Sequence, residues 1–274
     1  MFTAFKLVAI AALGGACSTY ALAATLRVCA DPNNMPFSDR AGQGFENRLA
    51  EMVAKDLGMS VTYFWFPQRS KFFEKTLNAG NCDVVMGVPL GIPVASTSIP
   101  YYQSSYVFVS RRDRHLKITS LDDPRLKTLR IGVHITGDED SNLPPVNALL
   151  RRGIVRNLVG FNIYGHLDEK NPPADLIRAV AAGKVDIAVA WGPMAGYFAR
   201  SSTVPLVVTP IDVVSPNPNL PFSFAISLGV RRGDSVLLQQ LNAEIERRRT
   251  QIDRLLQSYG VPLLTANTAV RTGY

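Results

Sequence analysis

Two stretches of the chain carry the same order of apolar and polar positions. Residues 77–89 read LNAGNCDVVMGVP, and residues 180–193 read VAAGKVDIAVAWGP. In each stretch a run that ends at a glycine predicts a helix C-terminus, because glycine adopts the left-handed cap conformation without the steric cost of a Cβ. The short apolar run after the aspartate then predicts a buried parallel strand.

This pattern repeats at a constant spacing. Gly80 and Gly183 are 103 residues apart, and the strand patterns LRV at Leu26 and LRI at Leu129 repeat at the same spacing. Two strand units repeated at one offset favour two similar α/β lobes in one chain; a chance match is the alternative.

The first lobe alternates between strand and helix patterns. Strands are predicted at residues 25–30, 61–66 and 83–88, and helices at residues 45–57 and 71–79. The first of these helices is amphipathic, with one apolar face formed by Phe45, Leu49, Met52, Val53 and Leu57.

The second lobe follows the same scheme. Strands are predicted at residues 129–133, 157–164, 186–190, 206–208 and 213–214. Helices are predicted at residues 146–152 and 174–182, the latter begun by Pro172 and Pro173, and Ser120 is expected to cap a further short helix. After residue 190, the segment Trp191-Gly192-Pro193 is expected to leave the sheet as a loop.

Two further runs predict strands that cross between the lobes, at residues 106–110 and 222–230, and residues 234–259 predict a long amphipathic helix that returns to the first lobe. We therefore assign residues 24–110 and 218–264 to lobe one, residues 111–217 to lobe two and residues 265–274 to a C-terminal tail.

The N-terminus has the pattern of a signal peptide. Lys6 precedes an apolar run at residues 7–16, and the sequence Ala-Leu-Ala at residues 21–23 fits a cleavage site, so residues 1–23 are expected to be removed on export. The apolar run is shorter than the ~20 residues that a membrane span needs. A lipoprotein anchored at Cys17 is the alternative, but Gly14 stands where such a signal has leucine.

The expected mature chain keeps two cysteines, Cys29 and Cys82. An even number of cysteines in an exported protein favours a disulfide. Cys29 lies in the first predicted strand and Cys82 directly precedes the third, and these strands are neighbours in a sheet of order 2-1-3. A pair of buried thiols is the alternative.

Composition describes a globular protein: 47% of the 274 residues are hydrophobic and 19% are charged. The formal net charge of +7 favours anionic partners, but no basic stripe is interleaved with aromatic residues, which argues against nucleic-acid binding. No catalytic or nucleotide-binding motif occurs, so neither an enzyme nor a cofactor is predicted.

Two groups of possible metal ligands are interpreted as ordinary surface residues. His115, His134 and His166 have no metal-ligand spacing and are expected on the surface or in loops. The three acids at residues 138–140 are adjacent in sequence and point in different directions, which favours a solvated loop over a cation site.

Ligands of open α/β sheets bind at the carboxyl ends of the strands. We therefore place the candidate binding cleft at this edge, and its candidate residues are Asp31, Asn33, Met35, Phe37, Trp65, Gln68, Pro89, Tyr101, Thr136, Asp138, Trp191 and Pro193. For Trp191 the alternative is a wall residue without a binding partner.

The order of elements resembles the periplasmic solute-binding proteins of ABC transporters that bind polar amino acids. The resemblance rests on Pro36 and Phe37 after the first strand, the GNCDVV and GKVDIAV strands, Pro100 and Tyr101, and the segment SLDDPRLKTLRIGV. It implies a type II periplasmic-binding-protein fold, with two mixed sheets joined by two crossing hinge strands and a hinge-bending motion that closes the lobes on a ligand.

Longer runs are similar to one branch of that family, the MoxJ/XoxJ group encoded beside PQQ-dependent methanol dehydrogenases. They are RVCADPNNMPFS, GFENRLAEMVAKDLG, PYYQSSYVFVSR and NPPADLIRAVAAGKVDIAVAWGPMAGYFA. This resemblance implies a periplasmic accessory protein whose partner is a PQQ-dependent methanol dehydrogenase. A transporter receptor for an unknown small molecule is the alternative.

The chain departs from the amino-acid binders at two positions. An arginine of that family clamps the ligand carboxylate, and an aspartate holds the ligand ammonium; by count, Gly91 and Trp191 occupy these places. We therefore expect a cleft that has exchanged charge for aromatic bulk and that suits an apolar side chain or a protein segment.

Overall fold

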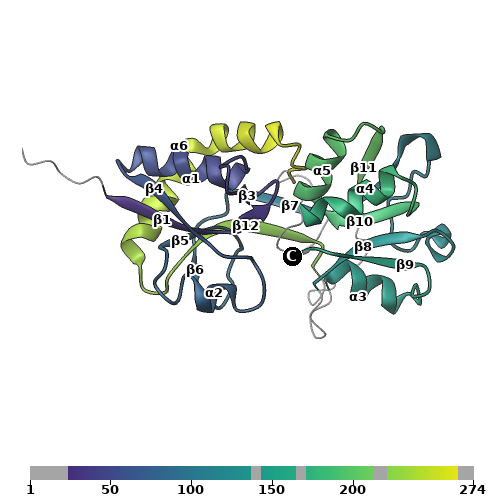
Figure 1. Cartoon of the computed structure of the whole chain (residues 1–274), viewed down its shortest axis with the longest axis horizontal. Helices are drawn as coiled ribbons and strands as arrows, with labels where there is room; N and C mark the ends of the chain where they lie inside the picture. Colours follow the sequence, from purple (N-terminus) through teal and green to yellow (C-terminus); the bar gives the residue numbers. More distant parts are fainter. Residues whose placement is uncertain (1–23, 137–142, 165–170, 213–220, 265–274) are drawn as a thin grey trace, which may run out of the picture.

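The computed structural model describes residues 24–136, 143–164, 171–212 and 221–264, and in it the chain forms two α/β lobes side by side. The first lobe lies at the left of Figure 1 and the second at the right, and long strands connect them. The predicted signal peptide, the strand predicted at residues 213–214 and the C-terminal tail lie outside the described residues.

The sheet of lobe one has the predicted order. Its three parallel strands run β4 (Ser60–Trp65), β1 (Thr25–Ala30) and β5 (Val84–Pro89). The crossing strand β12 (Ser223–Val230) continues this sheet antiparallel to β5, and the short strand β6 (Ser96–Thr97) pairs with β12. After β1, the strands β2 (Asn33–Asn34) and β3 (Ser38–Asp39) form a small antiparallel pair of their own.

Helices α1 (Phe45–Asp56) and α6 (Ser235–Ser258) cover one face of this sheet, and α2 (Phe72–Lys75) lies on the other (Figure 1). The apolar stripe of α1 is buried against that of α6, with Phe45, Leu49, Leu241 and Ile245 fully enclosed. Burial of these stripes is the main force that holds the helices on the sheet.

The sheet of lobe two is built in the same way. Its parallel strands run β10 (Ile187–Trp191), β8 (Ile131–Ile135) and β9 (Leu158–Asn162). Strand β7 (Tyr102–Arg111) pairs antiparallel with β10, and β11 (Leu206–Pro210) pairs antiparallel with β7. Its helices are α3 (Pro144–Arg151), α4 (Asp175–Ala181) and α5 (Gly192–Arg200), with short 3-10 turns η1 (Arg112–Arg114), η2 (Pro124–Lys127) and η3 (Pro172–Ala174).

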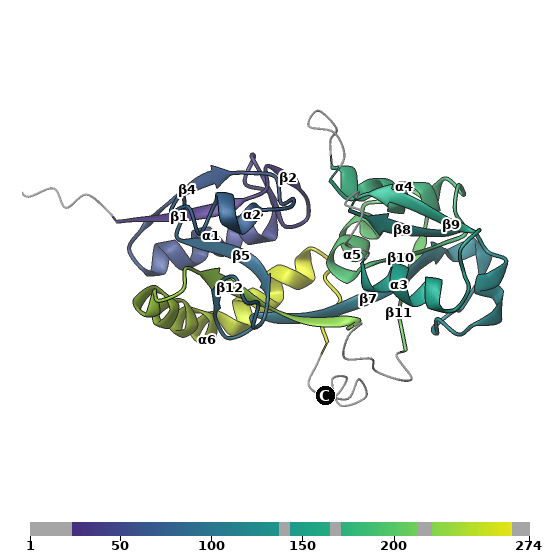
Figure 2. The ribbon, with the colours of Figure 1, turned by 90° about the horizontal axis from the view of Figure 1, so that it is seen from below.

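The two sheets meet at the crossing strands. Residues 102–105 of β7 pair with residues 223–226 of β12, and from Tyr106 onward β7 pairs with β10 instead. Figure 2 shows β7 and β12 running together from one lobe to the other. The partner change at Tyr106 precedes the boundary predicted after Ser110, so residues 106–110 make their ladder with the second sheet.

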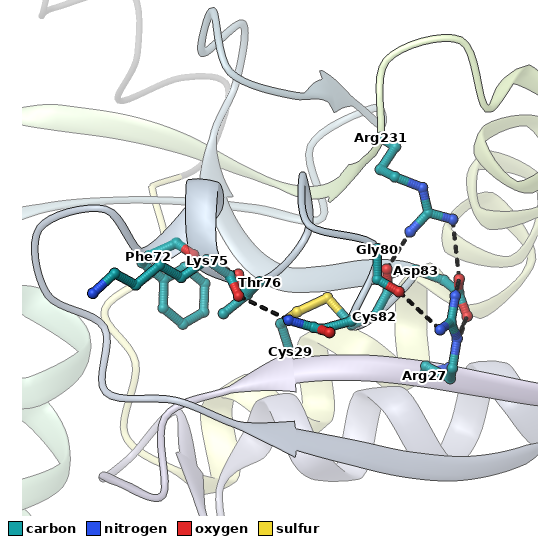
Figure 3. Close-up of a disulfide and its surroundings, with 10 residues drawn as sticks. Arg27, Cys29, Phe72, Lys75, Thr76, Gly80, Cys82, Asp83 and Arg231 are labelled. Carbon is teal, nitrogen blue, oxygen red and sulfur yellow. Dashed lines mark hydrogen bonds and ion pairs between the residues drawn. A yellow bond between two sulfur atoms is a disulfide. The ribbon is translucent and has the colours of Figure 1, made fainter.

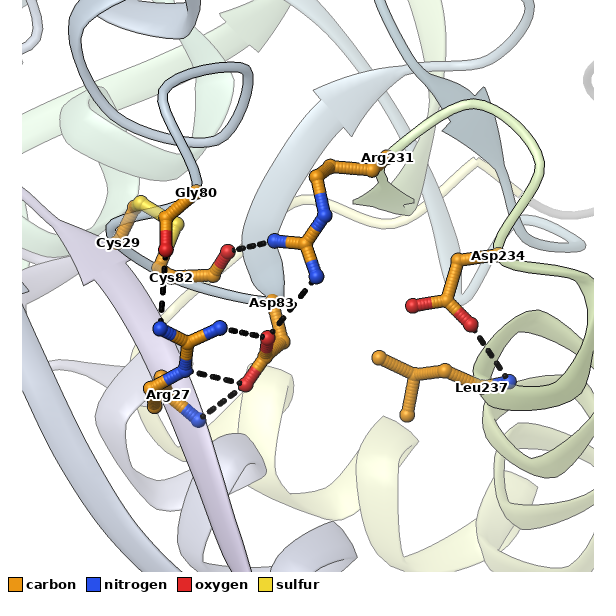
Figure 4. A network of polar contacts seen from close by, with 8 residues as sticks. All are labelled: Arg27, Cys29, Gly80, Cys82, Asp83, Arg231, Asp234 and Leu237. Carbon is orange, nitrogen blue, oxygen red and sulfur yellow. Dashed lines mark hydrogen bonds and ion pairs between the residues drawn. A yellow bond between two sulfur atoms is a disulfide. The ribbon is translucent and has the colours of Figure 1, made fainter.

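The repeat seen in the sequence is matched by repeated contacts. The Arg27 guanidinium donates to the Asp83 carboxylate at 2.6 Å and 3.0 Å and to the Gly80 carbonyl at 2.9 Å (Figure 4). Arg130 makes the equivalent bonds in lobe two, to Asp186 at 3.0 Å and 3.2 Å and to the Gly183 carbonyl at 2.8 Å. Each arginine therefore ties the end of a helical turn to the start of the following strand in its lobe.

The predicted disulfide is present in lobe one. Cys29 and Cys82 are bonded, with a Cα–Cα distance of 5.5 Å, and both side chains are buried with Phe72, Leu77 and Val85 (Figure 3). Arg231 donates a hydrogen bond to the Cys82 carbonyl and an ion-paired bond of 3.1 Å to Asp83 (Figure 4). The bridge and its neighbours thus join β1, the start of β5 and the end of β12.

A third connection between the lobes is made by the residues that follow α6. The Ser104 hydroxyl donates to the Pro262 carbonyl at 2.6 Å, and the Leu264 amide donates to the Gln103 carbonyl at 2.9 Å. Gly196 of α5 lies so close that a Cβ there would stand 1.9 Å from the Gly260 carbonyl oxygen. The C-terminal segment of the described chain is therefore held against both the hinge strand and lobe two.

Three sequence expectations need correction. The helix predicted at residues 71–79 ends at Lys75. The segment after Trp191 forms helix α5 rather than a loop, because Pro193 suits a first turn and Gly196 serves close packing instead of ending the helix. His134 lies in the interior, 3% exposed, with Nε2 3.0 Å from the Pro173 carbonyl, and burial lowers its pKa to about 4.

Candidate functional site

A cavity of ≈ 480 Å³ lies between the lobes, at the carboxyl ends of the parallel strands. Lobe one contributes residues of the loops after β1 and β4, of the end of β5 and of the first turn of α1. Lobe two contributes Leu143, Ile163, Tyr164, Trp191 and Met194. Among the described lining residues, all charged side chains belong to lobe one, and lobe two supplies an apolar and aromatic wall.

Asp31 fixes the shape of the lobe-one side. Its Oδ1 accepts the Asn33 amide at 2.8 Å, and its Oδ2 accepts the Gln68 amide at 2.7 Å. The Gln68 side chain in turn accepts from the Asn34 amide group at 3.1 Å. Burial raises the pKa of Asp31, while the bonds from Gln68 and Asn33 oppose that rise. Because both oxygens are held by backbone amides, Asp31 joins the loops after β1 and β4.

Glu46 lies in the first turn of α1 and faces the cavity. The turn is anchored by backbone bonds from Phe45 to the Pro36 carbonyl at 2.8 Å and from Glu46 to the Phe37 carbonyl at 2.9 Å. Although the side chain keeps partial exposure to the cavity, the surrounding protein desolvates it, and this burial raises its pKa to about 8, with a further contribution from the Asp31 charge. The carboxyl group is therefore mostly protonated at neutral pH in the empty cleft.

Gly87 in β5 leaves the space that the Glu46 carboxyl group occupies. A Cβ at residue 87 would stand 2.0 Å from Glu46 Oε1, so any side chain here would displace the carboxyl group. No described residue donates a hydrogen bond to this carboxyl group in the structure, which distinguishes it from Asp31.

Aromatic rings form much of the remaining wall. Trp191 packs edge-on against Tyr106 at 5.4 Å and against Phe224 at 5.7 Å between ring centroids. On the opposite side, Phe37 packs edge-on against Phe45 at 5.4 Å. Such edge-to-face ring contacts hold the walls of the cavity in place.

Two contacts join the lobes beside the cavity. The Arg69 guanidinium lies 5.9 Å from the centre of the Tyr164 ring, a cation–π distance. The Asn171 amide donates to Asn33 Oδ1 at 3.0 Å. In this conformation the two lobes therefore touch through residues that line the cavity, Asn33, Arg69 and Tyr164.

The structure brings about half of the candidate cleft residues to the cavity. Those that line it are Asp31, Asn33, Phe37, Gln68, Pro89 and Trp191. Tyr101 is fully buried in the core of lobe one, and its neighbour Tyr102 lines the cavity instead. Asp138 lies outside the described residues.

The other four candidates lie apart from the lining. Met35 and Pro193 are buried, and Thr136 follows the end of β8. Trp65 stacks on Tyr63 at 4.6 Å, with Arg40 5.8 Å from its ring centre, on lobe one away from the cavity. Their assignment to a partner surface stays a prediction.

Two charged lining residues, Glu46 and Arg69, were not among the candidates, so the cavity carries more charge than the expected exchange of charge for aromatic bulk implied. Glu46 had the pattern of a solvated acid in a first helical turn, where negative charge favours the helix dipole. A signal was available: α1 follows the loop at the carboxyl end of β1, so its first turn must lie at the edge where ligands bind.

Within the described residues no group of three or more His, Cys, Asp or Glu side chains is arranged to hold a metal ion. None of the helices formed by these residues is both long and apolar enough to cross a membrane.

Comparison with known proteins places the chain among two-lobed binding proteins. Residues 26–262 match the bacterial extracellular solute-binding proteins, family 3. Protein MoxJ of Methylorubrum extorquens is 34% identical over 258 residues, which span 88% of this chain and 82% of that protein.

Two solved structures extend the likeness. The crystal structure of the periplasmic binding protein XoxJ from Methylobacterium extorquens AM1 has a TM-score of 0.72 and 36% identity, covering 88% of this chain and 99% of that one. The crystal structure of MxaJ from Methylophaga aminisulfidivorans MPT has a TM-score of 0.75 and 30% identity, covering 87% and 100%.

Proposed function

This chain belongs to family 3 of the bacterial extracellular solute-binding proteins, and from that premise we propose that it is a periplasmic accessory protein of a PQQ-dependent methanol dehydrogenase. In this proposal the chain is exported, cleaved after Ala23, and binds the dehydrogenase through the interlobe cleft to activate or mature it. It acts by binding and not by catalysis.

The proposal is carried by the similarity to MoxJ and XoxJ proteins together with the loss of the two charged residues that would hold an amino acid. The chain is similar to MoxJ and XoxJ proteins over nearly all of its described length. The MoxJ/XoxJ group, which the chain resembles in sequence, is encoded beside PQQ-dependent methanol dehydrogenases. The positions that would hold the two charged ends of an amino acid are instead Gly91 and Trp191. Trp191 lies in the cavity wall, where tryptophan is a common anchor of protein interfaces.

The loop after β5 adds an exposed apolar surface beside the cavity. Pro89 lines the cavity, and the following Leu90 and Val94 are 51% and 42% exposed in a loop without charged residues. Exposed apolar side chains grouped next to a cleft favour contact with a protein surface.

The proposal is tested with purified proteins and with a deletion strain. Tagged mature chain is mixed with the purified dehydrogenase, and complex formation is measured by gel filtration and by surface plasmon resonance. The double variant Leu90→Asp/Val94→Asp should weaken binding at least tenfold. The matched control is Val236→Asp, which places the same charge at a 68% exposed valine on α6, outside the cavity lining.

In cells, deletion of the gene should lower periplasmic methanol dehydrogenase activity, and the Val236→Asp gene should restore it while the double variant should not. Normal dehydrogenase activity in the deletion strain, with no complex between the purified proteins, would refute the proposal.

A second candidate function is a transport receptor for a small molecule. The cavity of ≈ 480 Å³ between the lobes, with Asp31, Asn33 and Gln68 on its wall, favours it. A thermal-shift screen of alcohols, PQQ and lanthanide complexes tests it, because a ligand present at 100 times its Kd stabilises the folded state by about 2.7 kcal/mol. A ligand that raises the melting temperature of the wild type but not of a Trp191→Ala variant would support this function.

A further inference from the structure

We propose that the cleft binds an organic cation, an ammonium or guanidinium group on an apolar stem, with the Glu46 carboxylate as its counter-ion. Where the cation is a lysine or arginine side chain of the partner, the inference rests on the proposed function and names the chemistry that the cleft recognises. Where it is a free amine, the inference stands without that function.

The first argument is the position of the carboxyl group. Glu46 is held at the cavity by the anchored first turn of α1, and Gly87 leaves the space that its carboxyl group fills. No described residue donates a hydrogen bond to it, and the side chain keeps partial exposure to the cavity. A ligand in the cavity can therefore reach this carboxyl group and supply the hydrogen bond that the described residues do not.

The second argument is the set of groups that face Glu46. Burial and the charge of Asp31 both disfavour the ionised form of Glu46. Burial and, to a smaller extent, the charge of Glu46 raise the pKa of Tyr101 and Tyr102. The Asp31 oxygens are already held by the Asn33 and Gln68 amides. Glu46 is thus the lining carboxyl group that remains available to a cation.

The third argument is the wall. Phe37, Tyr102 and Trp191 line the same cavity, together with apolar Met194 and Ile226. Aromatic faces attract both ammonium and guanidinium groups, and guanidinium is the more weakly hydrated of the two. A metal ion would instead require several oxygen or nitrogen ligands, and the described residues offer no such cluster.

Arg69 makes a rival ligand testable. Its guanidinium also lines the cavity, although it lies against Tyr164 of lobe two. If it were the carboxylate anchor, the cleft would take a zwitterion and not a simple cation. A zwitterionic probe with the same apolar stem therefore separates the two possibilities.

Cation binding should release a proton. Glu46 has a pKa of about 8 in the empty cleft, so at pH 7 it is about 90% protonated. A bound cation favours the ionised form, and the site must then lose about 0.9 proton per ligand. A neutral ligand that accepts a hydrogen bond from the acid would release none.

The test is calorimetric titration of the mature chain at pH 7 in two buffers of different ionisation enthalpy, which yields the number of protons released. The probes are n-butylammonium, n-butylguanidinium, the neutral n-butanol and the zwitterion norleucine. The variants are Glu46→Gln, which keeps the shape of the side chain, and Glu51→Gln, a matched change at an exposed glutamate of α1 outside the cavity lining. Circular dichroism confirms that each variant is folded.

We expect a butyl cation to bind the wild type and Glu51→Gln with release of about 0.9 proton, and to bind Glu46→Gln at least tenfold more weakly without release. Equal binding to Glu46→Gln, tighter binding of butanol or norleucine than of either cation, or no cation binding in any arm would overturn the inference.

The source of the cation is resolved with the purified dehydrogenase. If the partner supplies it, Glu46→Gln should weaken the complex and n-butylammonium should compete with the dehydrogenase. Glu46-dependent amine binding with no dehydrogenase complex supports the inference and refutes the proposed function. A complex that forms equally with wild type and Glu46→Gln, with no amine binding, refutes the inference and leaves the proposed function standing.

Discussion

Loss of the Cys29–Cys82 disulfide should destabilise lobe one more than any single side-chain truncation on the surface. The bridge joins residues separated by 53 positions and is buried, with Cys29 2% and Cys82 0% exposed. A cross-link stabilises chiefly by limiting the freedom of the unfolded chain, and a loop of this size corresponds to about 4 kcal/mol. For a chain of this length that loss lowers the melting temperature by about 8–16 °C.

The protein without the disulfide can be prepared in two independent ways. The wild-type protein is reduced with dithiothreitol under denaturing conditions and refolded, and the double variant Cys29→Ala/Cys82→Ala removes both sulfur atoms. Both should lose about 4 kcal/mol of unfolding free energy in urea, and the variant somewhat more because it leaves space in the core. The slope against urea should rise, since an uncrosslinked chain exposes more surface on unfolding.

The two tryptophans report on the lobes separately. Trp65 lies in β4 of lobe one, and Trp191 ends β10 of lobe two. Fluorescence of Trp65→Phe and Trp191→Phe backgrounds therefore follows each lobe in turn. The urea midpoint seen by Trp65 should fall on reduction by more than that seen by Trp191. A loss below 1 kcal/mol in both the reduced protein and the alanine variant would refute the chain-entropy argument.

Three further outcomes follow from buried groups and close contacts. Burial lowers the pKa of His134 to about 4, so the unfolding free energy should fall by about 3 kcal/mol in total as the pH drops from 6.5 toward 4. The unfolding free energy of His134→Gln, measured in urea, should depend less on pH over this range. Parallel pH dependences of the variant and the wild type would contradict this. Burial raises the pKa of Glu46 to about 8, so this group lowers the stability of the wild type as the pH rises from 4.5 to 8. The unfolding free energy of Glu46→Gln should match that of the wild type below pH 4.5 and exceed it by about 4 kcal/mol at pH 8. Equal stability at pH 8 would argue against the buried acid. Gly196→Ala, which brings a Cβ to 1.9 Å from the Gly260 carbonyl oxygen, should cost about 1–3 kcal/mol in thermal unfolding; an unchanged melting temperature would mean that α5 and the C-terminal segment move apart freely.

The sequence predicted the architecture well because its strands are short apolar runs that each follow a glycine-ended helix. The strand order of lobe one, the crossing strands and the disulfide were accessible, since each depends on patterns within a few residues or on parallel pairing of neighbouring units. The 103-residue repeat also had a physical basis in the paired contacts of Arg27 with Asp83 and of Arg130 with Asp186.

The cleft was harder to predict because its character depends on contacts between segments far apart in the chain. Glu46 reads as a solvated helix residue until Gly87 is placed against it. Tyr101 and Tyr102 are adjacent aromatic residues, and only the start of β7 decides which is buried and which lines the cavity. Helix α5 was not predicted, and the reason for Gly196 within it, a close approach to Gly260, depends on a segment 64 residues further along the chain.

The segment at residues 260–264 limits how the molecule can flex. A pair of adjacent strands such as β7 and β12 permits both bending and torsion, but the bonds of Ser104 to Pro262 and of Leu264 to Gln103 brace the same junction from the α6 side. Any movement that shifts residues 262–264 relative to residues 103 and 104 must break these two hydrogen bonds. Among the described residues, this segment therefore couples the two lobes in addition to the paired strands β7 and β12.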